Sequence, residues 1–348
     1  MFNYWLFVGT AFIFSIALND WLISLANHKK WFLPAIRPRD EHQQPTPRIG
    51  GLAVVLAFLL TVLLIQIFKP GSLNFTGQSF FGLDRNLVGL LVALIIISVV
   101  NIADDFRGLT WQTKLTIQVI AAVTITSFGI LIPTVSNPFG GIIELGQLTW
   151  IFVVLWLVVI SNVINWLDSI DGVAGGVSTI TLIILFCLSI SSAVNQPANA
   201  TLAVVGAGVT LGFLVFNLRG KVFLGDTGSM FLGFLIGVIA IISGGKVATV
   251  FLVLAIPFLD ALVVVVTRLM GGQSPFQADR RHLIHRLLDR GFKKWQIIGL
   301  FYGLSLVFGL IALNTQSLGK FWAILVTMVI MTLLVLLYSF GAKRHGQG

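Results

Sequence analysis

The chain has 348 residues, of which 57% are apolar and only 10% are charged, and its mean hydropathy is +0.97. A soluble domain carries roughly 25% charged residues, so this chain has too little polar surface to cover a globule in water. The composition excludes a disordered protein and a disulfide scaffold, because Cys187 is the only cysteine. We therefore expect an integral membrane protein. In such a protein a formal net charge of +9 reflects basic residues in the loops on one side of the membrane, so we expect no nucleic-acid partner.

Mainly apolar runs follow one another along the whole chain, and each is long enough to cross about 30 Å of hydrocarbon as a helix. We expect eleven spans, near residues 2–26, 50–68, 86–101, 115–133, 149–165, 177–194, 200–217, 229–243, 247–267, 295–313 and 320–340. None of them alternates with a period of two, so a transmembrane barrel is not indicated. The predicted fold class is therefore all-α, a polytopic membrane bundle forming one domain over residues 1–348. Gly233 with Gly237, and Gly299 with Gly303, fit small-residue helix packing.

Basic residues fall almost entirely in alternate connections between these runs. The odd-numbered connections and the C-terminal tail hold all 22 Lys and Arg residues except Lys69, Arg85, Lys246 and Lys320. Because cytoplasmic loops carry the excess of basic residues, we expect the N-terminus outside and the C-terminus in the cytoplasm. Most carboxylates also fall in or beside these cytoplasmic connections, although orientation does not require acids there. A different chemistry must explain their grouping.

Asp104 and Asp105 end the third predicted span at the membrane interface. Two adjacent carboxylates repel each other and are hard to keep ionised at that depth without a cation. The pair therefore indicates a site that handles a divalent metal or phosphate. The alternative is two solvated loop acids beside Arg107.

The segment that leaves the fifth span carries a polar residue at every third position, namely Asn162, Asn165, Asp168 and Asp171. Residues at this spacing are neighbours on a helix surface, and together they can bind a nucleotide, a sugar or a metal. A purely structural role for four polar groups at that depth is the weaker interpretation.

Two further segments suit a phosphate ligand. In the run from Phe223 to Ser229, glycines allow close backbone approach and Asp226 offers an oxygen to Mg²⁺, although an ordinary turn fits too. In the ninth connection, His282 and His285 lie one turn apart among six basic residues between 280 and 294. That cluster can neutralise phosphate charges, or it can simply anchor the chain to anionic lipid.

These pieces come from four cytoplasmic connections, so they can meet only if the helices bundle around one interfacial cavity. The inventory suits a water-soluble diphosphate with Mg²⁺, and a lipid partner entering from the bilayer. The rival class is a transporter of an anionic solute. It would place ionisable groups near the bilayer centre, where these spans have almost none.

At this point five motifs carry a resemblance, and they are Pro45–Gly51, Asp104–Asp105, Asn162–Gly172, Phe223–Ser229 and Pro257–Leu288. In this order the chain resembles the polyprenyl-phosphate N-acetylhexosamine-1-phosphate transferase family. Members of that family make the first lipid intermediate of peptidoglycan or start the synthesis of other cell-envelope glycans. The segments at Ser274–Phe276 and His282 favour the N-acetylglucosaminyl-phosphate branch.

The resemblance implies the reaction and its partners. The phosphate of an undecaprenyl-type lipid would attack the sugar-linked phosphorus of a UDP-N-acetylhexosamine, giving a lipid diphosphosugar and UMP. N-acetylglucosamine 1-phosphate is the expected group, with another UDP-N-acetylhexosamine or UDP-MurNAc-pentapeptide as alternatives. The implied cofactor is Mg²⁺, with Mn²⁺ as an alternative. The implied location is the plasma (inner) membrane, with a cytoplasm-facing site and an oligomeric state left open, a homodimer included.

The same resemblance implies roles for individual residues. The catalytic group would be Asp104, Asp105, Asp171 and His282. The metal would be held by Asp226 with Asp105. The substrates would be bound by Arg48, Asn162, Asn165, Asp168, Asn217, Phe223, Arg281 and His285.

Three departures from the family pattern bear on sugar identity and the loop path. Ile284 stands where this branch often has a further His, and Ser169 stands where a Gly often follows the first Asp. Residues 217–221 read Asn-Leu-Arg-Gly-Lys, where the family usually has Asn followed by Pro-Ala, and this segment is one residue shorter than usual.

Overall fold

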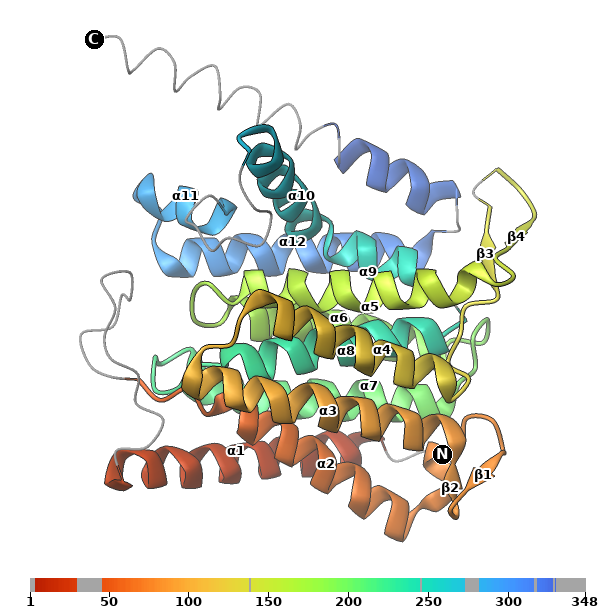
Figure 1. Cartoon of the computed structure of the whole chain (residues 1–348), viewed down its shortest axis with the longest axis horizontal. Coiled ribbons are helices and arrows are strands. Elements are labelled where there is room, and N and C mark those ends of the chain that lie inside the picture. Colours follow the sequence, from red (N-terminus) through yellow and green to blue (C-terminus); the bar gives the residue numbers. More distant parts are fainter. Residues whose placement is uncertain are drawn as a thin grey trace.

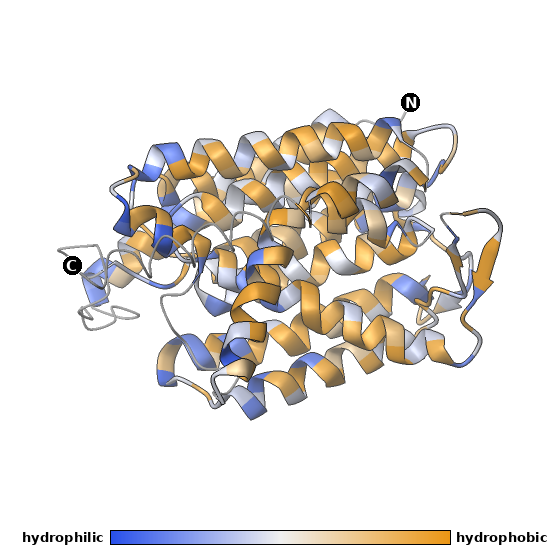
Figure 2. Ribbon diagram, turned by 90° about the horizontal axis from the view of Figure 1, so that it is seen from above, coloured by the Kyte–Doolittle hydropathy of each residue, from blue (hydrophilic) through white to orange (hydrophobic). Residues whose placement is uncertain are grey.

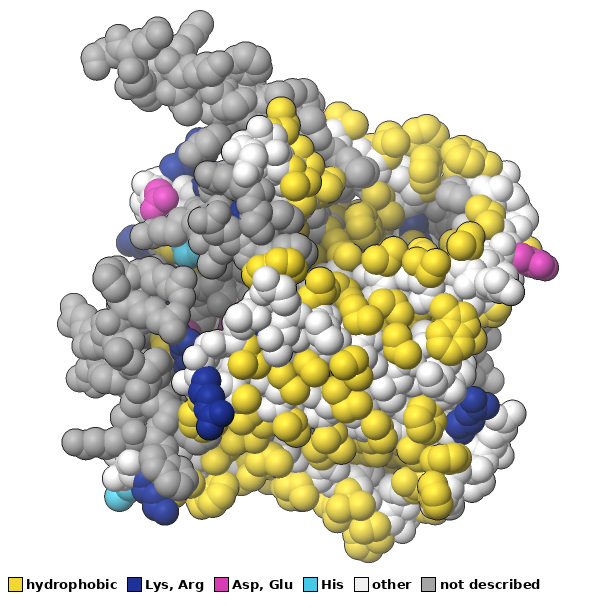
Figure 3. Space-filling view, in the orientation of Figure 1, with side chains coloured by type: hydrophobic (Ala, Val, Ile, Leu, Met, Phe, Trp, Pro, Cys, Tyr) yellow, Lys and Arg dark blue, Asp and Glu magenta, His cyan; other side chains and the backbone are white. Residues whose placement is uncertain are grey.

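The computed structural model describes residues 4–29, 46–137, 139–244, 246–272, 282–315, 318–327 and 329. Long helices lie side by side and antiparallel in an elongated bundle, and the connections gather at its two opposite ends (Figure 1). Apolar residues cover the length of the helices and hydrophilic residues concentrate toward the two ends (Figure 2). The side face likewise shows a broad hydrophobic band with charged side chains near its margins (Figure 3). This distribution is the one a lipid-embedded bundle requires.

The long helices from α1 to α8 alternate in direction along the chain, and α12 begins at the same end of the bundle as α8. Their bounds are α1 Tyr4–Lys29, α2 Gly50–Phe68, α3 Arg85–Arg107, α4 Trp111–Ser127, α5 Leu148–Leu167, α6 Val173–Ile190, α7 Pro197–Asn217, α8 Gly225–Ile242 and α12 Lys294–Asn314. Shorter helices are α9 Val247–Val253, α10 Ala255–Met270, α11 Leu283–Asp289, the 3₁₀ turn Pro70–Leu73 and an apolar helix at Leu318–Thr327. Two antiparallel hairpins lie at one end, pairing β1 Ser79–Phe80 with β2 Leu83–Asp84 and β3 Thr134–Ser136 with β4 Ile142–Glu144.

Within the described ranges, eight helices are long and apolar enough to cross a membrane, and α9 with α10 makes a ninth candidate. A polytopic helical membrane protein is therefore confirmed, whereas eleven spans and the orientation of the termini stay predictions. The run at 247–267 is not one continuous helix, because α9 and α10 meet at 81°. Pro257 has no N–H to extend the α9 hydrogen-bond ladder, which accounts for the break. Most of the run at 320–340 lies outside the described residues.

Helix α8 forms the centre of the bundle and packs on α2, α3, α5, α6 and α7. Gly233 makes the contact with α5 possible, since a Cβ there would lie 2.6 Å from the Cα of Ser161. One turn on, the indole of Trp156 donates to the carbonyl of Gly237 at 3.1 Å. The predicted packing role of Gly233 and Gly237 is confirmed. The same prediction for Gly299 and Gly303 is wrong, because both face open space among the described residues.

A single carboxylate organises the end of the bundle that carries the hairpins. One oxygen of Asp84 caps α3 by accepting from the backbone amide of Asn86 at 2.9 Å. Its other oxygen accepts from the amides of Phe75, Thr76 and Gly77. Burial acts to raise the pKa of Asp84, but these hydrogen bonds outweigh it and hold the pKa below its usual range.

We expect Asp84→Ala to lower the free energy of unfolding by about 1 kcal/mol or more, the usual cost of losing an N-cap. A depressed pKa in the folded state means that this stabilisation is present above the ordinary carboxyl range and is lost as the pH falls through the folded pKa. Thermal unfolding of the purified protein in detergent, at neutral and at acidic pH, measures both. Exposed Glu144→Ala, at the same end, is the control and should show neither effect.

Candidate active site

The site lies at the other end of the bundle and is built around the first turn of α8. Asp105, on the last turn of α3, accepts hydrogen bonds from the amides of Asp226 (2.9 Å) and Thr227 (3.1 Å) and from the Thr227 hydroxyl (2.6 Å). These amides are among the unpaired donors of a helix N-terminus, which favours a negative group. Both oxygens of Asp105 are thereby engaged. Its geometry favours a positioning role over the metal-binding and catalytic roles that the sequence suggests.

Asp226 extends the network to side chains of α3, α4 and α5. Its carboxylate forms an ion pair with the ammonium of Lys114 on α4, and the same ammonium pairs with Asp104 on α3. The other oxygen of Asp226 accepts from the amide of Asn165 at 3.1 Å, and Asn165 also donates to the hydroxyl of Ser229 at 2.9 Å. Asp226 is thus linked to three neighbouring helices.

Asp168 lies where α5 ends, close to the same turn of α8. Burial raises the pKa of Asp168 well above its usual range, and three neighbouring negative charges add to the shift, those of Asp171, Asp226 and Asp105. A hydrogen bond from the backbone amide of Gly225 acts in the opposite direction. The concentration of negative charge is therefore high enough to favour binding of a cation or a proton.

The turn between α5 and α6 holds Asp171 at the edge of this cluster. Asn217 on α7 donates to Asp171 at 3.2 Å and accepts from the amide of Gly172 at 2.7 Å. Gly172 has a φ of +89°, a conformation that favours glycine. The ammonium of Lys294 lies 3.9 Å from the second oxygen of Asp171.

The shortened segment after α7 closes as a hydrogen-bonded turn. The amide of Lys221 donates to the carbonyl of Phe216 at 3.1 Å, and the side chain of Asn217 donates to the carbonyl of Val222 at 2.9 Å. The turn keeps the side chain of Asn217, at the end of α7, in contact with the loop that carries Asp171. The departure from the family pattern at 217–221 therefore leaves this hydrogen bond in place.

Arg48 and Phe223 lie on two strands of backbone joined by direct hydrogen bonds. The amide of Phe223 donates to the carbonyl of Pro47, and the amide of Gly50 donates to the carbonyl of Phe223, both at 3.0 Å. At Gly51 a Cβ would lie 2.2 Å from the backbone nitrogen of Gly228, so α2 and α8 touch through their backbones. The segment with Arg48 is thereby fixed beside the first turn of α8.

His282 lies at the start of α11 and is held by two other helices. Its Nδ1 is 2.9 Å from a carboxylate oxygen of Asp260 on α10, and its ring stacks on Trp166 of α5 at a centroid distance of 5.8 Å. Asp260 also accepts from the amide of Leu283 at 2.8 Å, so it positions both the ring and the backbone. His285 follows one turn later and is half-buried. Arg281 lies outside the described residues.

The remaining departures and one predicted ligand have structural roles. Asn162 donates to Gln118 on α4 at 2.7 Å and to the carbonyl of Val158, so its amide group joins two helices. Ser169 donates to the carbonyl of Trp166 and ends α5. Ile284 is buried and lines a small gap beside His282.

Some site residues were missed by the sequence analysis. Lys114 was counted there only as a topological charge, although it joins two carboxylates. In the run from Phe223 to Ser229, the sequence singles out the glycines and Asp226, whereas the structure adds Ser229, which accepts from Asn165, and Thr227, which donates to Asp105. A lone lysine at the end of a predicted connection, which the structure places in the first turn of α4, carries no sequence signal that separates these roles.

The donor set suits a hard divalent cation, which prefers carboxylate and hydroxyl oxygens. The positive charge that now lies between Asp104 and Asp226 is the ammonium of Lys114, which shows that this place attracts a cation. Among the described residues, no three acidic, His or Cys groups are arranged so that they could enclose a metal ion as they stand. Binding a metal there therefore requires Lys114 to give way.

The fold and the site define a membrane helical bundle with an acidic, cation-attracting cluster at one end. The family model for glycosyl transferase family 4 matches residues 87–244. A decaprenyl-phosphate N-acetylglucosaminephosphotransferase from Mycobacterium leprae is 32% identical over 81% of this chain and 75% of its own length. A probable undecaprenyl-phosphate N-acetylglucosaminyl 1-phosphate transferase from Bacillus subtilis is 30% identical over 80% of this chain and 76% of its own length.

A third relative belongs to another branch. A phospho-N-acetylmuramoyl-pentapeptide-transferase from Staphylococcus carnosus is 27% identical over 87% of this chain and 96% of its own length. The chain belongs to glycosyl transferase family 4. It is an enzyme of the class that transfers a sugar phosphate to a polyprenyl phosphate, as its motifs predict.

Gly225 provides a direct test of the contact between α3 and α8. A Cβ at this position would lie 2.8 Å from both carboxylate oxygens of Asp105, and the residue has a φ of +70°. The backbone conformation alone costs a non-glycine residue about 1–2 kcal/mol. We expect Gly225→Ala to lower thermal stability by at least that amount and to reduce transferase activity.

Gly299→Ala on α12 is the matched control, because nothing lies within 4 Å of its Cβ position. Both variants are compared by thermal unfolding and by UMP release. Equal behaviour of the two would show that Asp105 does not hold the first turn of α8.

Proposed function

We propose that this protein transfers N-acetylglucosamine 1-phosphate from UDP-N-acetylglucosamine to undecaprenyl-type phosphate, releasing UMP at the cytoplasmic face of the plasma membrane. The single observation that carries the proposal is the Asp104–Lys114–Asp226 ion-pair cluster beside Asp168 and Asp171. The names of the relatives support the substrates. The basic residues at the same end of the bundle, including Arg48, Arg107 and Arg219, support the cytoplasmic side.

A divalent cation, Mg²⁺ or alternatively Mn²⁺, would be held by Asp226 together with Asp104. When bound, it supplies neutralisation of the diphosphate charge and alignment of the reacting phosphorus. Asp105 positions the first turn of α8 and hence Asp226. The negative charges of Asp171, Asp226 and Asp105 around Asp168 favour a cation at this place.

The chain's own cations complete the charge balance. With a cation held by Asp104 and Asp226, Lys114 would be available to pair with the transferred phosphate. Lys294 lies at the edge of the site beside Asp171. His282, oriented by Asp260, lies on the α10 and α11 side of the site. The lipid phosphate is largely dianionic near neutral pH, since the second pKa of a phosphate monoester is about 6. Positioning and charge neutralisation therefore matter more than proton removal from the nucleophile.

Phe223 and Arg48 are the side chains proposed for the nucleotide end. Their two segments are joined by backbone hydrogen bonds, so an aromatic ring and a guanidinium lie on one rigid support. The ring would stack on uracil, and Arg48 would pair with phosphate.

The substrate is tested by product analysis. The purified protein is incubated with undecaprenyl phosphate and a panel of UDP-sugars, and the lipid product is identified by mass spectrometry. We expect a diphospholipid carrying N-acetylglucosamine. A product formed only from UDP-MurNAc-pentapeptide, or the absence of any lipid product, would refute the proposed substrate.

The metal site is tested by Asp226→Asn. We expect this substitution to lower the Mg²⁺-dependent rate of UMP release by a factor on the order of 10²–10³, the effect of losing a key charge at a phosphoryl centre. Thermal unfolding establishes that the variant is folded. Glu144→Gln, at the opposite end, should keep full turnover, and near-normal turnover of Asp226→Asn would remove Asp226 from the site.

Lys114 allows a test of cation binding that does not depend on activity. In Lys114→Met, the acids lose their counter-charge, and uncompensated buried charge is destabilising. We expect Mg²⁺ to raise the melting temperature of this variant more than that of the unchanged protein, because it restores the charge balance. Exposed Lys69→Met serves as the control. The same Mg²⁺ effect in all three proteins would argue against a cation site at Lys114.

A further inference from the structure

The bundle contains a second cavity, at the end opposite to the acidic cluster. It has a volume of about 390 Å³ and lies between the N-terminal ends of α3 and α7 and the C-terminal ends of α4 and α8. Volumes of about 300–1,000 Å³ are typical of small-molecule sites. The cavity plays no part in the proposed transfer reaction.

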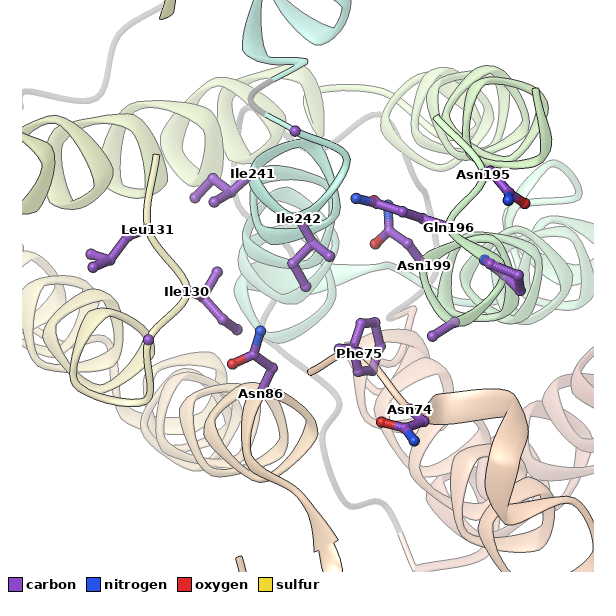
Figure 4. A pocket seen from close by; sticks show the side chains of 14 residues that line it. Asn74, Phe75, Asn86, Ile130, Leu131, Asn195, Gln196, Asn199, Ile241 and Ile242 are labelled. Atoms are coloured by element: carbon purple, nitrogen blue, oxygen red, sulfur yellow. The ribbon is translucent and has the colours of Figure 1, made fainter. Parts of the chain in front are cut away.

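The polar lining of this cavity consists of amides. Five amide side chains line it, and they are Asn74, Asn86, Asn195, Gln196 and Asn199. Among the described residues that line it, none is acidic, basic or a histidine. Gln196 and Asn199 point in from the α7 side and Asn86 from the α3 side, across Phe75 and Ile242 (Figure 4). The cavity thus combines many uncharged hydrogen-bonding groups with an apolar surface.

Two of these amides have a buried acceptor oxygen, the Oε1 of Gln196 and the Oδ1 of Asn199. Among the described residues, no donor forms a hydrogen bond to either oxygen. The Asn199 side chain is fully buried, and its Nδ2 donates to the Ser189 hydroxyl at 3.1 Å, to the Ile239 carbonyl at 3.2 Å and to the Ser243 hydroxyl. These contacts fix the amide and leave its oxygen to accept from another group. A buried acceptor left unsatisfied costs about 1–3 kcal/mol, so a ligand that supplies donors is favoured.

The absence of charge in the lining narrows the ligand class. A phosphate or carboxylate would find no cation among the described lining residues. Nearby Arg85 donates instead to the carbonyl of Ser127 at 3.1 Å and to Gln78 at 3.4 Å. Hydroxyl groups donate and accept without charge, and C–H faces of a sugar ring suit the apolar side formed by Phe75 and Ile242.

We propose that this cavity binds an uncharged, hydroxyl-rich group, a sugar ring, on the face of the bundle opposite to the acidic cluster. The ring could come from a free glycoside or from the headgroup of a neutral glycolipid, and both carry the same donors. The site is independent of the proposed transferase reaction.

The test uses the full-length protein in lipid nanodiscs and two probes. In one arm, binding of methyl β-glucoside is followed by saturation-transfer NMR. In the other arm, nanodiscs contain monoglucosyl diacylglycerol, and the melting temperature is compared with that in nanodiscs lacking it. We expect saturable binding or stabilisation in at least one arm, and the arm that responds identifies the source of the sugar.

Variants assign the response to this cavity. Gln196→Leu and, separately, Asn86→Leu remove amides for which the structure shows no side-chain hydrogen bond, and each should weaken binding at least tenfold. Gln147→Leu, an exposed residue at the same end, should leave it unchanged. Asp226→Asn should also leave it unchanged, because the acidic cluster lies at the other end.

Four results would overturn the proposal. They are no saturable response in either arm, an equal response in Gln147→Leu and the cavity variants, loss of the response in Asp226→Asn, and displacement of the probe by inorganic phosphate. If Gln196→Leu fails to fold, Asn86→Leu decides, since Asn86 is only half-buried.

Discussion

The structure depends on one interaction, the carboxylate of Asp105 at the first turn of α8. Because three donors of that turn end on Asp105, the C-terminal end of α3 and the start of the central helix α8 are joined. Asp226 is the second residue of α8, so this contact fixes its position. The remaining partners, Lys114 and Asn165, come from the two helices that pack beside it. The geometry of the acidic cluster is therefore set by a hydrogen-bonded helix terminus.

The two ends of the bundle have opposite chemistry, and the apolar helices between them explain why. At one end, acids accumulate around α8 and are balanced by lysines from α4 and α12. At the other end, a cavity is lined by uncharged Asn and Gln side chains. The carboxylate of Asp84 at that end accepts hydrogen bonds from backbone amides. Charge is kept out of the apolar middle because burying it there is costly. The two ends thus offer ligands different chemistry, an acidic cluster at one and uncharged amides at the other.

Much of this arrangement could be predicted from the sequence. Long apolar runs and the excess of basic residues in alternate connections indicate a helical membrane bundle, and the spacing of the acids indicates that they converge. The break between α9 and α10 was not predicted, because a proline after an apolar stretch is compatible with either a kink or a continued span. The role of Lys114 was hidden for a different reason. Whether a lysine serves topology or pairs with acids depends on which helix ends meet in space, and local patterns do not encode that.

The direct contact between α2 and α8 at Gly51 and Gly228 has a mechanical consequence. Backbone meets backbone there, because neither glycine has a side chain that could rotate to absorb a displacement. If α2 tilts to match a thinner or thicker bilayer, α8 would have to tilt with it. A change in bilayer thickness would then shift the positions of Arg48 and Asp226. Lipid composition would therefore affect the rate of turnover as well as the solubility of the protein.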